Sequence, residues 1–151
     1  MQGLVAKEKK FWFGYKKHAS ADMRNGIITK VAVTPANITD QDGLKYICPY
    51  GGMVFGDKAY GLSPAQLAMK ANGCHSGAIL RDNMKNKNRD KDKWLTKIRM
   101  PFENIFSKDD GFTRYRGLAK VQMQALFEAI VHNVKRLLKI NCPPLFQPFA
   151  A

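Results

Sequence analysis

The chain has 151 residues, of which 45% are hydrophobic and 11% aromatic, so it is long and apolar enough to fold as one domain. It carries 25 Lys and Arg against 12 Asp and Glu, and the resulting net charge of +13 favours a polyanionic partner, nucleic acid first. A basic membrane-surface protein is less favoured, because the basic residues are scattered and form no cationic amphipathic terminus.

The cysteines and the N-terminus indicate an intracellular protein. Cys48, Cys74 and Cys142 are odd in number and include no Cys-x-x-Cys pair, which argues against a zinc knuckle or a disulfide framework and for reduced thiols. The opening residues lack the uninterrupted apolar core of a signal peptide, and no apolar run is long enough to span a membrane.

Residues 11–35 are expected to form a β-hairpin. Two strand-like runs, the first rich in aromatics, flank an Arg-Asn-Gly tripeptide, and Asn-Gly tolerates the positive φ angles of a tight hairpin turn. After the hairpin, Thr39 or Asp40 could cap a short helix that turns Leu44 and Ile47 inward.

The next elements alternate between strand and helix. Residues 53–60 are typical of a short apolar strand. A helix is expected to start at Ser63 as N-cap, with Gln66 completing a capping box, and to end at Gly73. Residues 74–80 are again typical of a strand, and this order predicts a mixed α/β sheet.

The second half of the chain begins with a basic segment. Residues 81–99 hold eight basic residues against three aspartates, which is typical either of a solvated loop or of a surface for phosphate backbones, and a helix should begin near Trp94. Residues 118–140 should form a long helix that is largely buried except for one polar stripe. The stripe consists of Lys120, Gln124, Glu128, His132 and Arg136.

Asp57 directly follows a glycine-flanked apolar run, where it could form a turn, cap a helix or bind a metal ion. Glu103 lies in a segment typical of a helix. Carboxylates from a strand end and a distant helix are oxygen ligands of the kind that Mg²⁺ takes. The histidines, His18, His75 and His132, are scattered, and His132 is expected at the surface.

Three blocks of the sequence, within residues 11–138, resemble the catalytic core of bacterial insertion-sequence transposases. They are "FGYKKHASADMRNGIITKVAVTPANITDQ", "VFGDKAYG" and "PFENIFSKDDGFTRYRGLAKVQMQALFEAIVHNVKRL", in the order that the family shows. The likeness is to the DDE enzymes of the insertion sequence four and five groups. It implies an α/β, ribonuclease H-like mixed sheet with flanking helices. It also implies cleavage and strand transfer of double-stranded DNA, at transposon ends and target, with Mg²⁺ or Mn²⁺ as cofactor.

By this resemblance Asp57 matches the second catalytic aspartate and Glu103 the catalytic glutamate, so both are the implied catalytic residues and metal ligands. The family's first catalytic aspartate lies on a strand upstream of the hairpin, and residues 1–10 contain no aspartate. Asp22 and Asp40 are available replacements, but the first lies beside a turn and the second at a helix entry, which disfavours both.

Arg99 matches the basic residue of the family's Tyr-Arg-Glu-Lys signature and would clamp a phosphate. The signature's Tyr falls at Thr96 and its Lys at Asp110, with Lys108 as a nearby substitute for the lysine. The residues expected to contact DNA are Arg99, Lys108, Lys58, Arg81, Lys85, Lys87, Arg89 and Trp94.

The expected organisation is an unstructured extension at residues 1–10, a truncated catalytic core at residues 11–140 that lacks the first central strand, and an irregular tail at residues 141–151. The expected function is DNA transposition in the bacterial cytoplasm at the nucleoid, and the assembly could be a homodimer. Two alternatives stay open: a non-catalytic basic nucleic-acid-binding remnant, and a basic interaction domain such as a ribosome-associated factor.

Overall fold

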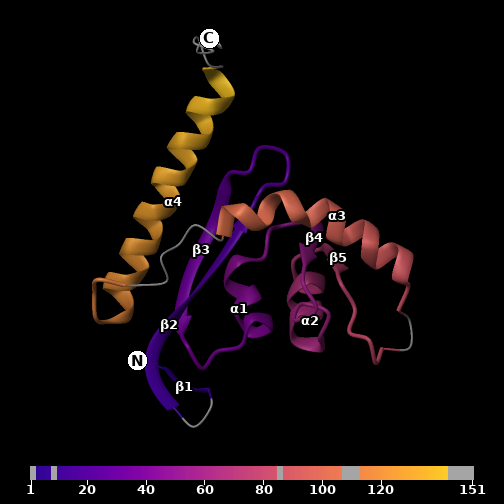
Figure 1. The fold of residues 1–151 in the computed structure, drawn as a ribbon, viewed down its shortest axis with the longest axis horizontal. Coiled ribbons are helices and arrows are strands. Elements are labelled where there is room, and N and C mark those ends of the chain that lie inside the picture. The colour runs from indigo at the N-terminus through magenta and orange to yellow at the C-terminus, as the bar shows by residue number, and fades with distance from the viewer. Residues whose placement is uncertain (1–2, 8–9, 85–86, 107–112, 143–151) are drawn as a thin grey trace, which may run out of the picture.

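A computed structural model describes residues 3–7, 10–84, 87–106 and 113–142 (Figure 1). In this part of the chain one antiparallel sheet has the strand order β1-β2-β3, and β4 and β5 form a separate parallel pair. The elements are β1 (Gly3–Lys7), β2 (Lys10–Ala21), β3 (Ile28–Pro35), α1 (Asp40–Ile47), β4 (Gly52–Gly56), α2 (Ser63–Ala71), β5 (Cys74–Ala78), α3 (Arg89–Phe106) and α4 (Leu118–Asn141).

The structure corrects the prediction that residues 1–10 are unstructured. β1 lies there and pairs with β2, with Gly3 opposite Gly14 and Lys7 opposite Lys10, because pairing satisfies the backbone polar groups of both strands. No strand among the described residues joins the two sheets. The mixed α/β architecture is confirmed, and it is compatible with a ribonuclease H-like fold.

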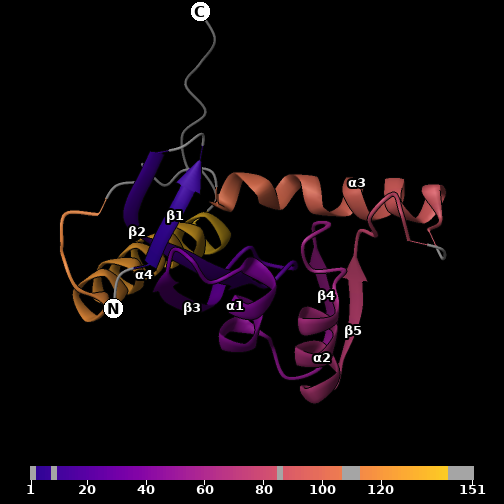
Figure 2. The same ribbon diagram turned by 90° about the horizontal axis from the view of Figure 1, so that it is seen from below.

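The β2–β3 hairpin has a helix on each face, α1 on one and α4 on the other (Figures 1 and 2). Successive side chains of a strand point to opposite faces, so Lys17 contacts Glu128 of α4 while His18 faces α1. His18 is 3% exposed, and its Nε2 lies 2.8 Å from the Oγ1 of Thr34. Gly43 makes room for the ring, since a Cβ there would lie 2.3 Å from His18 Cε1.

Helix α1 begins and packs as the sequence predicts. Thr39 is its N-cap, and its Oγ1 accepts a hydrogen bond of 3.3 Å from the Asp42 N–H. Leu44 and Ile47 are each 3% exposed and form a core cluster with Met69 of α2.

The start of α2 differs from the predicted capping box. Leu62 is the N-cap and makes no side-chain capping bond, and Ser63 is the first helical residue. Gln66 instead donates hydrogen bonds to the Tyr60 carbonyl at 3.1 Å and to the Ser76 hydroxyl at 2.8 Å. These contacts to the preceding turn and to β5 occupy the side chain that the capping box would have needed.

Helix α3 is longer than the sequence indicated. It begins at Arg89, where a loop was expected, and continues through Pro101 to Phe106. Its Leu95 is 2% exposed, and the helix lies against β4 near the predicted catalytic segment (Figure 2).

Helix α4 forms where predicted, but it buries only small apolar residues, Val121, Ala125 and Ala129, and leaves its large apolar side chains exposed. The polar stripe does not face solvent as a whole: His132 Nε2 lies 3.0 Å from the Gly26 carbonyl oxygen, and Arg136 Nε donates to the Asn25 carbonyl at 2.6 Å. His132 is half-buried rather than fully exposed, because the hairpin turn presents carbonyl oxygens that these side chains satisfy.

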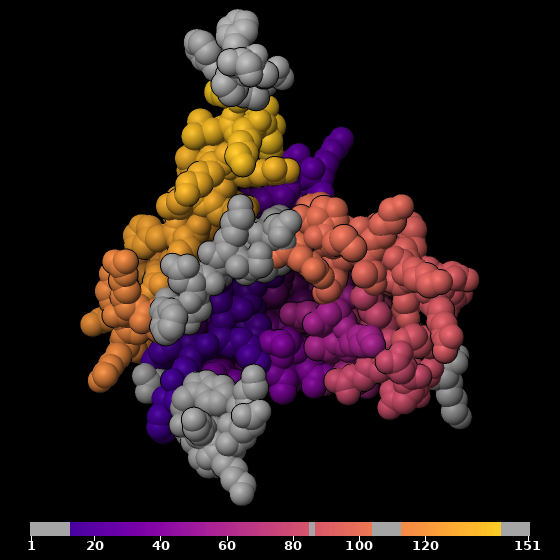
Figure 3. Space-filling model, viewed as in Figure 1, coloured from indigo at the N-terminus to yellow at the C-terminus, as the bar shows by residue number. Residues whose placement is uncertain are grey.

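The outward side of α4 is apolar. Figure 3 shows this helix forming one flank of the molecule, with α3 on the opposite flank. Large apolar side chains of α4, between 40% and 59% exposed, are Met123, Leu126, Phe127, Ile130, Val131, Val134, Leu137, Leu138 and Ile140. Among the described residues no helix is long and apolar enough to cross a membrane.

Candidate active site and basic surfaces

Asp57 follows β4 directly and is exposed. Its Oδ1 accepts a hydrogen bond of 2.9 Å from the Ala59 N–H, and its carbonyl accepts one of 3.2 Å from the Tyr60 N–H. The side chain therefore forms a turn at the strand end, which is one of the three roles considered for it. This turn holds the carboxylate at the carboxyl end of β4.

Tyr60 shows which charged groups surround this turn. Burial, together with the carboxylates of Asp40 and Asp57, raises the pKa of Tyr60 to about 12, and the Arg99 guanidinium opposes this rise. The ring packs over Gly56, where a Cβ would lie 2.7 Å from it. Charged groups at the end of β4 and in the middle of α3 thus both affect the pKa of the half-buried Tyr60 phenol.

On α3, Arg99 and Glu103 are one helical turn apart and form an ion pair. An Arg99 Nη2 to Glu103 Oε1 distance of 2.6 Å joins them, and the Glu103 side chain is 54% exposed. The buried Arg99 Nε has no hydrogen-bond partner in the described chain. Through its Nη2, the Arg99 guanidinium is engaged by the Glu103 carboxylate.

Asp57 and Glu103 supply carboxylate oxygens, which suit a Mg²⁺ ion bound through one or two carboxylates and water. No three His, Cys, Asp or Glu side chains of the described residues group as a metal site would require. Asp22 accepts hydrogen bonds from the Arg24 and Asn25 N–H groups, and Asp40 lies 3.2 Å from the Lys16 ammonium.

Two of the predicted DNA-binding lysines are held by an aspartate that the sequence did not single out. Asp82 lies 2.9 Å from Lys58 Nζ and also pairs with Lys87, which lies 3.5 Å from Asp92. The hydrogen bonds from Lys87 and Lys58 lower the pKa of Asp82 to about 2. The positive charge of the segment before α3 is therefore partly compensated within the chain.

Three of the other predicted DNA contacts are solvent-exposed. Arg81 and Arg89 are exposed, and the Trp94 ring is 53% exposed on α3. Lys85 and Lys108, like Asp110 of the signature comparison, lie outside the described residues.

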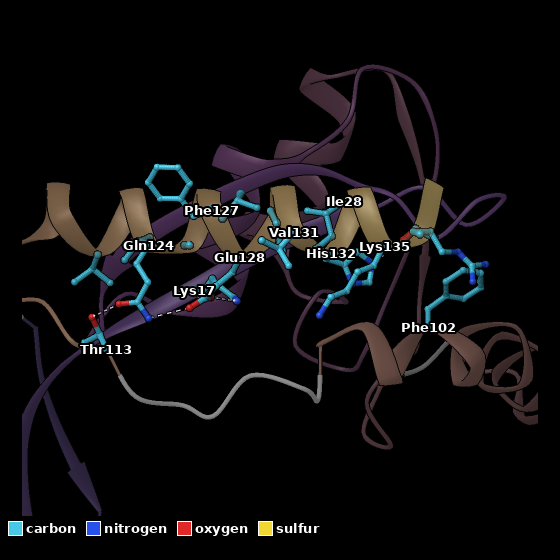
Figure 4. A pocket seen from close by; sticks show the side chains of 18 of the residues that line it. Lys17, Ile28, Phe102, Thr113, Gln124, Phe127, Glu128, Val131, His132 and Lys135 are labelled. Atoms are coloured by element: carbon cyan, nitrogen blue, oxygen red, sulfur yellow. Dashed lines mark hydrogen bonds and ion pairs between the residues drawn. The ribbon is translucent and has the colours of Figure 1, made fainter. Parts of the chain in front are cut away.

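A groove of about 1470 Å³ follows α4, bounded by the β2–β3 hairpin and by the end of α3. Figure 4 shows Thr113 and Gln124 at one end of it and Lys135 and Phe102 at the other. Phe102 immediately precedes Glu103, so this groove reaches the turn of α3 that carries the predicted catalytic glutamate.

The charge of the groove is strongly positive. The carboxylate among its described lining residues is Glu128, and it is paired with Lys17 at 3.0 Å. The basic lining residues are Lys17, Arg24, Arg114, Lys135, Arg136 and Lys139. Sequence reasoning missed this surface, although Arg136 belonged to the predicted stripe, because no local pattern brings α4 beside the hairpin turn.

Comparison with known families identifies the domain. The family model described as the transposase DDE domain matches residues 3–134, which is most of the chain. Neither the curated proteins nor the solved structures include a match.

Proposed function

Because the chain belongs to the DDE transposase family, we propose that it acts in DNA transposition by cleaving double-stranded DNA at transposon ends and joining it to a target. The observation that best supports this proposal is the convergence of Asp57 and Arg99 on Tyr60. It brings the end of β4 near α3, which also carries Glu103.

In this proposal Asp57 and Glu103 hold a divalent cation, Mg²⁺ or Mn²⁺. When bound, such an ion polarises the scissile phosphate and stabilises the charge that develops on the leaving 3′ oxygen. The turn at Ala59 keeps the Asp57 carboxylate at the strand end. Arg99 positions Glu103 through their ion pair.

We further propose that residues 11–140 belong to a ribonuclease H-like core in which the third carboxylate comes from a strand between β2 and β4. The described part of β4 pairs with β5 alone, and residues 15–21 of β2 pair with β3 alone. Each of these strands therefore has one edge at which a further strand could form backbone hydrogen bonds. The outward apolar side of α4 supports a homodimer as the assembly.

The test is cleavage of duplex DNA in the presence of Mg²⁺. We expect Asp57→Asn and Glu103→Gln each to lower the cleavage rate at least about 100-fold while duplex binding is kept, because both remove an anionic oxygen ligand. Asp90→Asn is the matched control, since Asp90 is an exposed carboxylate on α3 beside Lys93.

Cleavage that survives both substitutions would contradict the assigned roles. Duplex binding with no cleavage by the unsubstituted chain would instead favour a non-catalytic DNA-binding protein, the second candidate. The observation that favours this second candidate is that the described residues include no group of three possible metal ligands.

A further inference from the structure

The groove along α4 combines exposed aromatic rings with basic side chains. Phe127 is 59% exposed and Tyr115 is 51% exposed, and both line the groove. Core packing does not explain why these two rings are exposed beside cations, because neither ring is part of the core beneath α4. That core is formed by Val33, Val121 and Ala125.

The cations of the groove are more available than those of the segment before α3. Lys58 and Lys87 are engaged by Asp82, whereas Lys135 and Lys139 have no carboxylate partner among the residues that the structure describes. A polyanion bound to Lys135 and Lys139 would therefore displace no carboxylate of the residues that the structure describes.

We propose that this groove binds one unpaired strand of nucleic acid, with its phosphates on Lys135 and Lys139 and its bases stacked on Phe127 and Tyr115. A positive groove with exposed aromatic rings is the arrangement that holds single strands, because every base offers a face for stacking whatever its sequence. A duplex buries those faces, so it would use the cations but not the rings.

The position of the groove gives this strand a role. The lining stretch of α4, from Val121 to Lys139, extends about 27 Å at 1.5 Å per residue, which is room for several nucleotides. One end lies at Phe102, next to Glu103 (Figure 4). A strand separated beside the cleavage site would enter the groove directly. This role rests on the proposed function, whereas the binding site itself does not.

The experiment measures binding of the full chain to a fluorescent oligothymidine and to a duplex of equal length. We expect Phe127→Ala to weaken oligothymidine binding by about 5- to 100-fold and to leave duplex binding nearly unchanged, because one stacked base is lost. The matched control is Tyr46→Ala, which removes an exposed ring on α1 outside the groove.

A second pair of variants tests the cations. Lys135→Gln combined with Lys139→Gln should weaken oligothymidine binding and flatten its dependence on salt, with a slope smaller by about 0.7 for each lost phosphate contact. Lys45→Gln with Lys70→Gln changes the charge equally on α1 and α2 and should have the smaller effect. Light scattering on each variant shows whether it keeps the mass of the parent chain.

Equal losses in the groove and control variants would overturn the proposal, as would a Phe127→Ala protein that binds oligothymidine normally. A Phe127→Ala protein that loses only self-association would also overturn it, since the ring would then contact a second copy. Asp57→Asn separates the two proposals, because it should stop cleavage and leave oligothymidine binding intact.

Discussion

His18 illustrates at the scale of one residue how a polar side chain joins two elements. It projects from β2 into the contact with α1, bonds to Thr34 on β3, and requires a glycine at position 43. Burial lowers the pKa of His18 below its ordinary value, with the nearby Asp40 carboxylate opposing the shift and Lys16 adding to it. The neutral ring is therefore the form that fits the fold.

This environment predicts a loss of stability in mild acid. Because the unfolded chain takes up the proton near pH 6.5 and the folded chain only at lower pH, the stabilisation by neutral His18 is complete above about pH 6.5 and is lost as the pH falls below it. Thermal midpoints measured from about pH 8 to pH 5 should fall more steeply for the parent chain than for His18→Gln, whose side chain does not titrate. Parallel curves for the two proteins would contradict the assignment.

At the scale of elements, α4 packs against the hairpin with small and polar residues, although its sequence pattern predicted that its large apolar residues would be buried. Small and polar residues face the hairpin, where Asn133 accepts from the Ile28 N–H at 2.8 Å and Gln122 from the Val33 N–H at 2.7 Å. These are backbone groups of β3 that no strand of the described chain satisfies. The helix thus acts as a hydrogen-bonding cover for β3 and leaves its apolar side outward.

The outward side of α4 predicts self-association. The seam consists of apolar residues that do not line the groove and that are spaced three and four apart, as in a helix that pairs along one face: Met123, Leu126, Ile130, Val134 and Leu137. A standard interface buries about 800 Å² of each partner, so a dimer along this face would bury its apolar neighbours as well. We expect a dimer by light scattering at micromolar concentration.

The variants that test this dimer carry the same added charge at different places. Ile130→Glu should give a monomer with unchanged helical content, because the carboxylate would be buried in the seam. Leu67→Glu, at a residue of α2 that is 67% exposed, should remain dimeric. A parent chain that is monomeric throughout would show that α4 does not pair with a second copy.

For the whole molecule, the net charge of +13 describes the balance of residues but not where that charge is available. Asp82 neutralises lysines next to the candidate active site, whereas the groove beside α4 keeps most of its cations uncompensated among the described residues. Counterion release depends on the cations that reach phosphates, so affinity should follow this distribution rather than the total.

Asp82→Asn tests that distribution. The substitution frees Lys58 and removes one of the two carboxylates beside Lys87, so duplex binding should strengthen several-fold and its log–log dependence on salt should steepen by about 0.9 to 1.8, for one or two phosphates. Anisotropy titrations over a range of salt concentrations measure both quantities. If Asp90→Asn, which changes the net charge equally, has the same effect, the local pairing at Asp82 is not the cause.

The elements that the sequence predicted correctly are those specified by neighbouring residues. The hairpin around Asn25 and Gly26, the Thr39 cap and the extent of α4 all depend on local turn chemistry or on helix periodicity. The capping box at Ser63 failed because Gln66 found partners on the preceding turn and on β5, which local spacing cannot reveal.

For the candidate site, the sequence by itself determined the residue types: the carboxylates of Asp57 and Glu103, the adjacent Arg99 and an excess of basic side chains. Only the tertiary structure decided which of those charges are already paired, that Tyr60 lies between the two elements of the site, and that α4 turns its polar side toward the hairpin. The physical reason is that a periodic pattern gives a helix two distinguishable faces, but the partners available in space determine which face is covered.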